Sequence, residues 1–475
     1  MISINKIMNQ LRLRKINSNF LLCFVIAFTF SFRAQEVITL TIEKSVDFAL
    51  KQNPELQIAE KEVLKAKAGV WEAYSTILPQ LDAYANLDHA WEIQTSRIPN
   101  FLKPMLAPVA GTIPGIDLMP DFVDIAFGLE NTLRTGATVT QPLFLGGAGI
   151  AGIQAAKASR RASEENLRLQ KQTLILESSR AFYSCLLAEE LVKVQEEALN
   201  EAKANLEVVT KRYNVGTASG FDKMRAEVDV ANLEPDVIAT RNNYQSALTQ
   251  LRTILGLSRE TQIDISGEFQ YQEDDFGNVT LPELQESALS MRPEVKALIE
   301  QKYIAAKGVT IARSNFLPKL FFHTDYSYLA MRDNLKFTGD DFSKGFTSSL
   351  NLQVPLFHGF RNSKQYQKAR LDYRMMLDTE KQLRDGIAAE VEVVYNNFQE
   401  AQQKFLSAQK TVALAEEALR LANLMYEEGA NTQLDVLNSR LALTRAKMSY
   451  ATSLFEYQVA RYQIRKVTGQ LEGII

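Results

Sequence analysis

The feature that most constrains the fold of this 475-residue chain is an internal repeat that covers much of its sequence. The segment from Pro142 to Gly256 matches a later segment, from Pro355 to Gly469, without a gap. Farther upstream, "NPEL" and "ILPQL" in the first half match "RPEV" and "FLPKL" in the second, again at a constant spacing. Repeats of this kind predict two copies of one structural unit, over 35–256 and 281–475.

The two copies differ in length at one place, between Pro79 and Pro142, where the first copy has additional residues. This stretch is rich in proline, with Pro99, Pro104 and Pro108 followed by two more. Proline punctuates loops rather than continuing helices or strands. We therefore predict a long loop over 92–131 that is present in the first half only.

The N-terminus carries a second signal. Several basic residues precede the apolar run "FLLCFVIAFTFSF", which is short for a bilayer-spanning helix. We interpret residues 1–34 as an export signal peptide, with a short membrane anchor as the alternative. The charge is nearly balanced, with 53 Lys and Arg against 56 Asp and Glu, so the chain has no basic footprint for nucleic acid.

Each half contains one stretch with the period-two alternation of β-strands. We predict one β-hairpin over 80–141 and another over 319–354, which gives four strands in the chain. In the first hairpin, Leu81, Ala83, Ala85 and Leu87 alternate on one side, and the returning residues Leu133, Thr135, Ala137 and Val139 alternate too.

A very long helix is predicted after each hairpin, over 147–213 and over 360–426. Apolar residues recur in both at spacings of three and four, which indicates a left-handed coiled-coil seam. The first seam comprises Cys185, Ala188, Val192, Gln195, Leu199, Ala202, Leu206, Val209 and Tyr213, and the second runs from Phe398 to Tyr426 at matching positions. Each helix is about 100 Å long at 1.5 Å per residue, so the chain cannot be a compact globule.

Each long helix ends in a tight tip turn, over 214–220 and over 427–433. Gly216 and Gly429 suit a left-handed C-terminal cap. The pairs Ser219–Asp222 and Thr432–Asp435 have the spacing of a capping box, which opens the next helix. Returning helices are therefore predicted over 221–256 and 434–469, antiparallel to the long ones.

The returning helices are about half as long as their partners. A shorter helix over Pro54–Leu78 begins with proline in its first turn, where the missing N–H costs nothing. Stacked end to end on the returning helix, it would match the length of the long helix. The polar segment 257–280 is expected to be irregular and to join the two halves at mid-height.

Four amphipathic strands leave two open edges, and a sheet in a bilayer must close on itself. Bacterial barrels begin at eight strands. If these strands cross a membrane, the chain must therefore oligomerise: two copies would supply eight strands, and three copies would supply twelve.

With these features the chain resembles the TolC-like outer-membrane efflux and secretion channels. The resemblance rests on the duplicated "PLF" joint, on the turns "RYNVGTASGFD" and "MYEEGANTQLDVL", and on "NPEL" and "RPEV". It implies a mainly α fold with a small β part, in which a homotrimer forms a twelve-stranded barrel in outer-membrane lipid. It also implies a periplasmic helical tunnel that docks, through the helix turns, to a periplasmic adaptor linked to an inner-membrane pump.

The function predicted on this basis is a passive exit duct of an efflux or type I secretion system. The alternative is a periplasmic coiled-coil adaptor or scaffold. An outer-membrane enzyme is a third hypothesis, but no catalytic motif is present in the sequence. We predict neither a cofactor nor a metal site, because His89, His323 and His358 are scattered without a second ligand at metal spacing.

The resemblance also suggests which residues form sites. The expected adaptor-docking tips comprise Tyr213, Gly216, Ser219, Asp222, Tyr426, Gly429, Thr432 and Asp435, although helix capping alone explains most of them. Glu427 and Glu428 are a candidate acidic aperture ring, with solvated surface charge as the alternative. The strand-to-helix joints are marked by Pro142, Phe144, Pro355 and Phe357.

Aromatic residues near the strand ends have two interpretations. Trp91, Tyr326 and Tyr328 are expected either in an aromatic belt at the membrane interface or in ordinary barrel packing.

Overall fold

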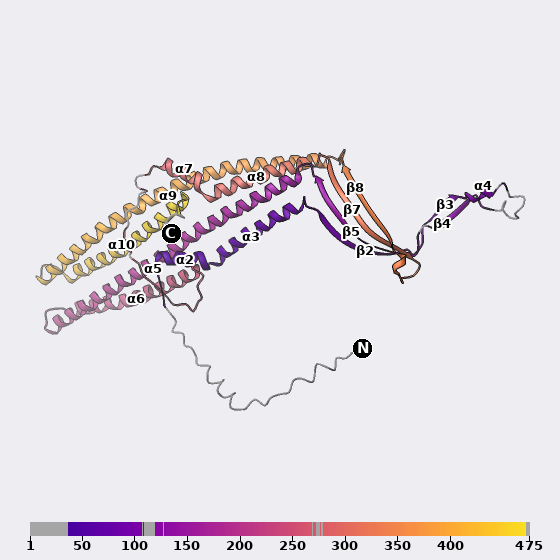
Figure 1. Ribbon diagram of the computed structural model, residues 1–475. Coiled ribbons are helices and arrows are strands. Elements are labelled where there is room, and N and C mark those ends of the chain that lie inside the picture. The colour runs from indigo at the N-terminus through magenta and orange to yellow at the C-terminus, as the bar shows by residue number, and fades with distance from the viewer. Residues whose placement is uncertain are drawn as a thin grey trace, which may run out of the picture.

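The computed structural model describes residues 37–106, 108, 119–126, 128–267, 269–271, 276 and 279–471. The predicted signal peptide 1–34 lies outside the described residues, as do parts of the predicted loop 92–131 and of the segment 257–280. Long helices lie side by side with a sheet at one end, and a thin ribbon extends beyond the sheet (Figure 1).

The two long helices are α5 (Ala148–Asn214) and α9 (Arg361–Glu427), each of 67 residues. Their bounds agree with the expected 147–213 and 360–426 within one residue. The other helices are α2 (Ile42–Gln52), α3 (Pro54–Ser75), α4 (Leu102–Leu106), α6 (Gly220–Ile254), α7 (Leu281–Met291), α8 (Pro293–Ser314) and α10 (Gln433–Val467).

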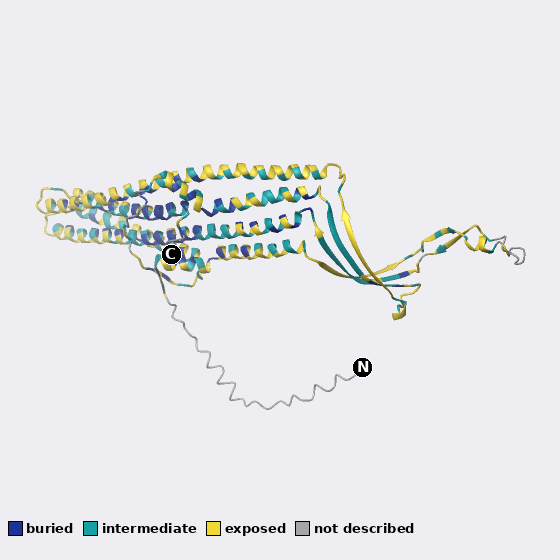
Figure 2. Cartoon of the chain, turned by 45° about the horizontal axis from the view of Figure 1, so that its top comes forward, coloured by how far each residue is buried: buried dark blue, intermediate teal, exposed yellow. Residues whose placement is uncertain are grey.

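The predicted coiled-coil seams are present in both long helices. In α9, Phe398 and Phe405 are fully buried against α10, and in α5 Cys185 and Val209 have no exposed surface. The largest apolar clusters lie at mid-height, where α2, α7 and the segment after α6 wrap the rods (Figure 2). None of the helices in the described part of the chain combines the length and apolarity needed to cross a bilayer.

The short helices stack on the returning helices, as their lengths predicted. The side-chain amide of Asn53, which caps α3, donates a 2.9 Å hydrogen bond to the carbonyl oxygen of Ile254 at the end of α6. Gly256 has a φ of 70°, and a Cβ there would lie 2.7 Å from the carbonyl oxygen of Gln52. Gly469 has the same role between α10 and α8, with a φ of 75°.

The main sheet is antiparallel with the order β2-β5-β7-β8. Its strands are β2 (Gln80–His89), β5 (Asn131–Phe144), β7 (Lys319–Arg332) and β8 (Ser343–Gln353). β5 and β7 pair across the boundary between the repeats, so the two predicted hairpins form one sheet. Within the described residues, neither β2 nor β8 has a neighbour on its outer edge.

The register separates the side chains of the sheet into an apolar and a polar face, because successive residues of a strand alternate. One row across all four strands is Ala83, Ala137, Tyr326 and Phe346, and this face also carries the exposed Leu81, Leu350 and Leu352. A row of the opposite face is Asp82, Thr138, Asp325 and Thr347. A water-filled barrel needs this division between lipid and lumen.

The prediction of four strands is confirmed for the main sheet, but it is wrong for the chain as a whole, and part of the predicted loop over 92–131 has secondary structure. β3 (Thr95–Pro99) and β4 (Phe122–Ala126) pair as an antiparallel ribbon beyond the main sheet, with α4 next to it. The ribbon was not predicted because the prolines of this stretch indicate a loop. Pro99 lies at the last position of β3, which is an edge strand of a two-stranded sheet and therefore tolerates proline.

The expectation that 257–280 is wholly irregular is also wrong. β6 (Ile263–Ile265) pairs in parallel with β1 (Ile38–Leu40), which lies at the start of the described chain, in the other repeat. Ile263 and Ile265 are buried in the mid-height core next to Leu40. A strand this short shows too little alternation to be distinguished from a loop in the sequence, so only the tertiary packing identifies it.

Candidate functional site

The first tip turn joins α5 to α6 and has the cap predicted from the sequence. Gly216 has a φ of 79°, and the N–H of Thr217 donates a 2.9 Å hydrogen bond to the carbonyl oxygen of Arg212, which closes the end of α5. Ser219 and Asp222 form a complete capping box at the start of α6. Tyr213 lies next to this turn, with the amine of Lys223 5.6 Å from its ring centre.

The second tip turn repeats this geometry between α9 and α10. Gly429 has a φ of 74°, and Thr432 and Asp435 form the corresponding capping box. Hydrogen bonds from the hydroxyl and the backbone N–H of Thr432 hold the pKa of the Asp435 carboxyl below its usual value. Glu427 is the last residue of α9, and Glu428 follows it as the C-cap.

The two tips lie side by side at the end of the rods that is farthest from the sheet (Figure 1). The guanidinium of Arg212 in the first tip lies 4.9 Å from the ring centre of Tyr426 in the second, in a cation–π contact. The structure thus brings the two predicted clusters of tip residues together within one chain. Arg212 was not among the predicted residues.

An ion-pair cluster that the sequence did not predict lies farther up the rods. Arg440 of α10 is buried, and its guanidinium lies 3.2 Å from a carboxylate oxygen of Asp229 on α6 and 3.7 Å from one of Glu201 on α5. Burial raises the pKa of the Asp229 carboxyl, and the charge of Arg440 opposes the shift. The sequence signal was a charge at a seam position of α10, between Val436 and Leu443.

One face of α6 carries a row of apolar residues that are exposed in the single chain. Phe221 is 67% exposed, Met224 62% and Val228 52%. Their spacing of three and four residues places them on one face of the helix. An exposed apolar stripe of this kind on a soluble surface usually marks a binding face. We refer to Phe221, Met224 and Val228 as the α6 stripe.

The two strand-to-helix joints differ more than the repeated "PLF" suggested. Pro142 and Phe144 belong to β5, which continues past a bulge between them and pairs with β7. Pro355 and Phe357 lie in an extended loop, because β8 ends at Gln353 before α9 begins. The side chains of Phe144 and Phe357 are exposed at both joints.

In the described part of the chain, no group of three or more His, Cys, Asp and Glu side chains could hold a metal ion. Trp91 lies next to His89 with ring centres 4.6 Å apart, beyond the end of β2. Tyr326 and Tyr328 lie in the middle of β7 rather than at its end, in contact with each other.

Comparison with known proteins decides the family. The chain matches the family described as "Outer membrane efflux protein" over residues 46–257 and 284–470, one match for each repeat. The chain belongs to this family. The two matched segments leave unmatched the region that contains β6, which joins the repeats.

Two curated relatives illustrate the range of the outer membrane efflux family. The chain is 24% identical to outer membrane protein TolC of Vibrio cholerae over 401 residues, which are 83% of this chain and 88% of the relative. It is 23% identical to the cobalt-zinc-cadmium resistance protein CzcC of Cupriavidus metallidurans over 348 residues, or 72% and 78% of the two chains. Over shorter alignments it covers 62% of the TolC protein of Escherichia coli.

A solved structure supports the same fold. The Campylobacter jejuni CmeC outer membrane channel superposes with a TM-score of 0.73 at 18% identity, over 97% of this chain and 94% of that channel. The mainly α fold with a small β part is therefore shown.

Family membership places the chain in the Gram-negative outer membrane, with its helical part extending into the periplasm. The chain is an exit duct of the efflux and secretion kind, which works with an adaptor and an inner-membrane pump. The alternative of a periplasmic scaffold is thereby set aside. The relatives are channels rather than enzymes.

Proposed function

We propose that three copies of the chain form a passive conduit whose two tip turns dock to the periplasmic adaptor and close its inner end. The single observation that supports this proposal is the four-stranded sheet with two open edges. It lies at one end of the long helices, and the paired tip turns lie at the other end. Strands β2 and β8 are the free edges at opposite ends of one sheet, so β8 of one copy pairs with β2 of the next. Three copies then close twelve strands.

The polar face of the sheet lines the lumen of this barrel. Asp82, Asn86 and Arg134 lie on this face, and the hydroxyl of Tyr84 donates a 2.9 Å hydrogen bond to Asp325 across the sheet. The apolar face, with Leu81 and Phe346, contacts lipid. A side-chain lining of mixed charge suits a conduit for diverse solutes, because it binds no single class tightly.

The tips supply the docking surface. The capping residues Ser219, Asp222, Thr432 and Asp435, together with Gly216 and Gly429, fix the shape of both turns, and Tyr213 and Tyr426 lie next to them. Capping and docking are then compatible, since the adaptor recognises a shape that the caps create. The Arg212–Tyr426 contact and the cluster around Arg440 hold the two hairpins together in the closed state.

Opening requires these hairpins to separate by untwisting. Glu427 and Glu428 of three copies form an acidic ring of six carboxylates at the closed end, which favours cations. Replacing both by glutamine is expected to reduce the cation preference of the conductance. An unchanged preference would contradict the ring and leave the conduit in place.

The conduit has no catalytic activity of its own, and the energy for transport comes from the pump. The chain offers no activated nucleophile at its buried cysteine, because burial raises the pKa of the Cys185 thiol to about 12. The strand-to-helix joints, marked by Pro142, Phe144, Pro355 and Phe357, connect barrel and tunnel and have a structural role.

The experiment that tests the conduit is the native mass of the full-length protein extracted from outer membranes in mild detergent. We expect three copies per particle and a conductance after reconstitution into planar bilayers. Recovery of a monomer or dimer without detergent would contradict the closed twelve-stranded barrel.

A further inference from the structure

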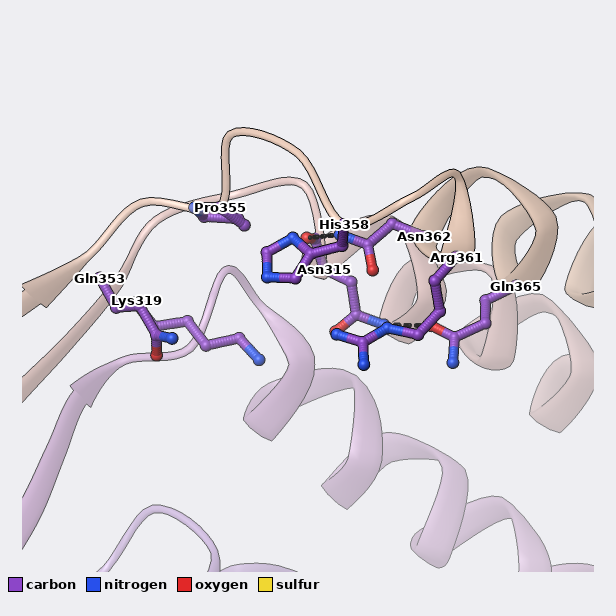
Figure 3. Close-up of a pocket in the computed structure, with 8 residues that line it drawn as sticks. All are labelled: Asn315, Lys319, Gln353, Pro355, His358, Arg361, Asn362 and Gln365. Atoms are coloured by element: carbon purple, nitrogen blue, oxygen red, sulfur yellow. Dashed lines mark hydrogen bonds between the residues drawn. The ribbon is translucent and has the colours of Figure 1, made fainter.

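A cavity of about 260 Å³ lies at the second strand-to-helix joint, between the starts of β7 and α9 (Figure 3). We call it the joint cavity. It is lined by Asn315, Lys319, Gln353, Pro355, His358, Arg361, Asn362 and Gln365.

The lining of the joint cavity is rich in hydrogen-bond donors and positive charge. Figure 3 shows the amine of Lys319 and the guanidinium of Arg361 extending toward one another, with the ring of His358 above them. None of the described residues that line it carries a carboxylate, and in the described part of the chain neither Lys319 nor Arg361 is in an ion pair. Two cations that converge without a counter-charge repel each other, so an anion between them is favoured.

The amide side chains around these cations are already ordered. The side-chain amide of Asn362 donates a 2.8 Å hydrogen bond to the carbonyl oxygen of Asn315. The amide of Asn315 in turn donates a 3.3 Å hydrogen bond to the side-chain oxygen of Gln365. These bonds tie the end of α8 to the start of α9, so the part of the wall formed by the amide side chains is held in place.

The register of the sheet indicates the side on which the joint cavity opens. Lys319 pairs with Gln353, and both lie on the polar face of the sheet together with His323 and Asp325. This face lines the lumen of the proposed barrel. The joint cavity therefore faces the water-filled path, at the level where barrel and tunnel meet, rather than the lipid.

The duplication shows that these cations are not required to build a joint. At the matching positions of the repeat, the first half has Gln80 in place of Lys319, Leu145 in place of His358 and Ala148 in place of Arg361. A cavity at the first joint is lined mainly by apolar residues such as Leu143, Phe144 and Ile150. The same strand-to-helix connection thus forms without positive charge.

We propose that the joint cavity binds a multivalent oxyanion within the duct, through Lys319, Arg361 and the ring of His358. The proposal rests on the conduit proposed above. Three copies place three such cavities around the lumen, and a ring of Lys and Arg side chains favours anions in the way that acidic rings favour cations. Phosphate-bearing and polycarboxylate solutes have the required charge and the acceptor oxygens.

The experiment uses inorganic pyrophosphate as the probe, added on the barrel side of the reconstituted full-length trimer. We expect pyrophosphate to reduce the current, and the variant Lys319→Gln with Arg361→Ala to need about tenfold more pyrophosphate for the same block. These substitutions introduce the residues that the first repeat already has, so the joint should still fold. Each single variant, measured separately, is expected to give part of the shift.

The matched control is Lys344→Gln, which removes the same charge from β8 on the apolar face, opposite Tyr328. Pyrophosphate should reduce the current through this variant at the same concentration as in the wild type. An equal block in the wild type and the double variant, at unchanged trimer mass and conductance, would overturn the oxyanion site and leave the conduit intact. A wild-type trimer that conducts no current would overturn the conduit itself and the site with it.

Discussion

The returning helices α6 and α10 have the same length and the same kind of capping box, but they differ in how far they are buried. Each has 35 residues, but four residues of α6 are buried against sixteen of α10. α10 packs against both α9 and α5, whereas α6 packs mainly against α5. Within one chain, α10 thus lies between two helices, whereas α6 has one main partner. We call α9 with α10 the inner hairpin and α5 with α6 the outer hairpin; the exposed face of α6 bears the α6 stripe.

The largest expected effect comes from charging the α6 stripe. Phe221→Asp with Met224→Asp should weaken adaptor binding by about a hundredfold, because exposed aromatic and methionine side chains dominate the binding energy of such interfaces. The measurement is the affinity of the detergent-solubilised trimer for the soluble adaptor of its export system. The native mass should stay unchanged.

The repeat supplies the control for this prediction. Leu434 of α10 is the counterpart of Phe221 in the second repeat and is 41% exposed. Leu434→Asp should reduce the affinity less. An equal loss would break the comparison, since both hairpins would then contribute equally to docking.

The next largest effect is expected at the link between the two hairpins. Arg440→Ala leaves the partly buried carboxylate of Asp229 without its closest cation and should lower the free energy of unfolding by about 2 kcal/mol. It should also raise the leak conductance of the closed duct. Thermal unfolding of the solubilised trimer and bilayer currents measure the two effects.

Glu227 is the counterpart of Arg440 in the first repeat and has an exposed side chain. Glu227→Ala should change the free energy of unfolding by less than about 0.5 kcal/mol. If Arg440→Ala and Glu227→Ala lowered the free energy of unfolding equally, the ion pairs of Arg440 would not distinguish the inner hairpin from the outer one.

The smallest effect is a dependence of the second tip on pH. The folded-state pKa of Asp435 is depressed, so its capping bonds stabilise α10 fully above the ordinary carboxyl value of 3.8. That stabilisation is lost as the pH falls through the lower folded-state pKa. Hydrogen exchange in the first turn of α10 should therefore increase in acid after correction for intrinsic rates.

Asp435→Asn is the control for this experiment, because an asparagine at this position does not titrate. The variant should show no acid-dependent step. A step of the same size in the variant would assign the pH dependence to another group.

The parts of the fold that the sequence predicted are those set by local chemistry. The positive φ of Gly216 and Gly429 and the two capping boxes depend on residues within one turn, so the spacing identified them. The stacking of α3 on α6 followed from comparing helix lengths. Membership of the family followed from motifs that both repeats share.

The parts that the sequence could not predict depend on distant neighbours. Both long helices have the same heptad seam, so nothing local indicated that α10 would be the inner helix. The partner of Arg440 is Asp229, which lies in the other repeat. The ribbon of β3 and β4 was obscured by proline, and the cations of the joint cavity converge only when β7 and α9 meet.

The stacked helices have a mechanical consequence. Among the described residues, no continuous ladder of backbone hydrogen bonds crosses from α6 into α3 or from α10 into α8, because each pair meets at a glycine turn next to Asn53 or Arg292. Rotation applied at the tips is therefore transmitted to the sheet end by the two uninterrupted helices, α5 and α9. The other two rods have a junction at mid-height where the helix is interrupted, so they transmit rotation less directly than α5 and α9.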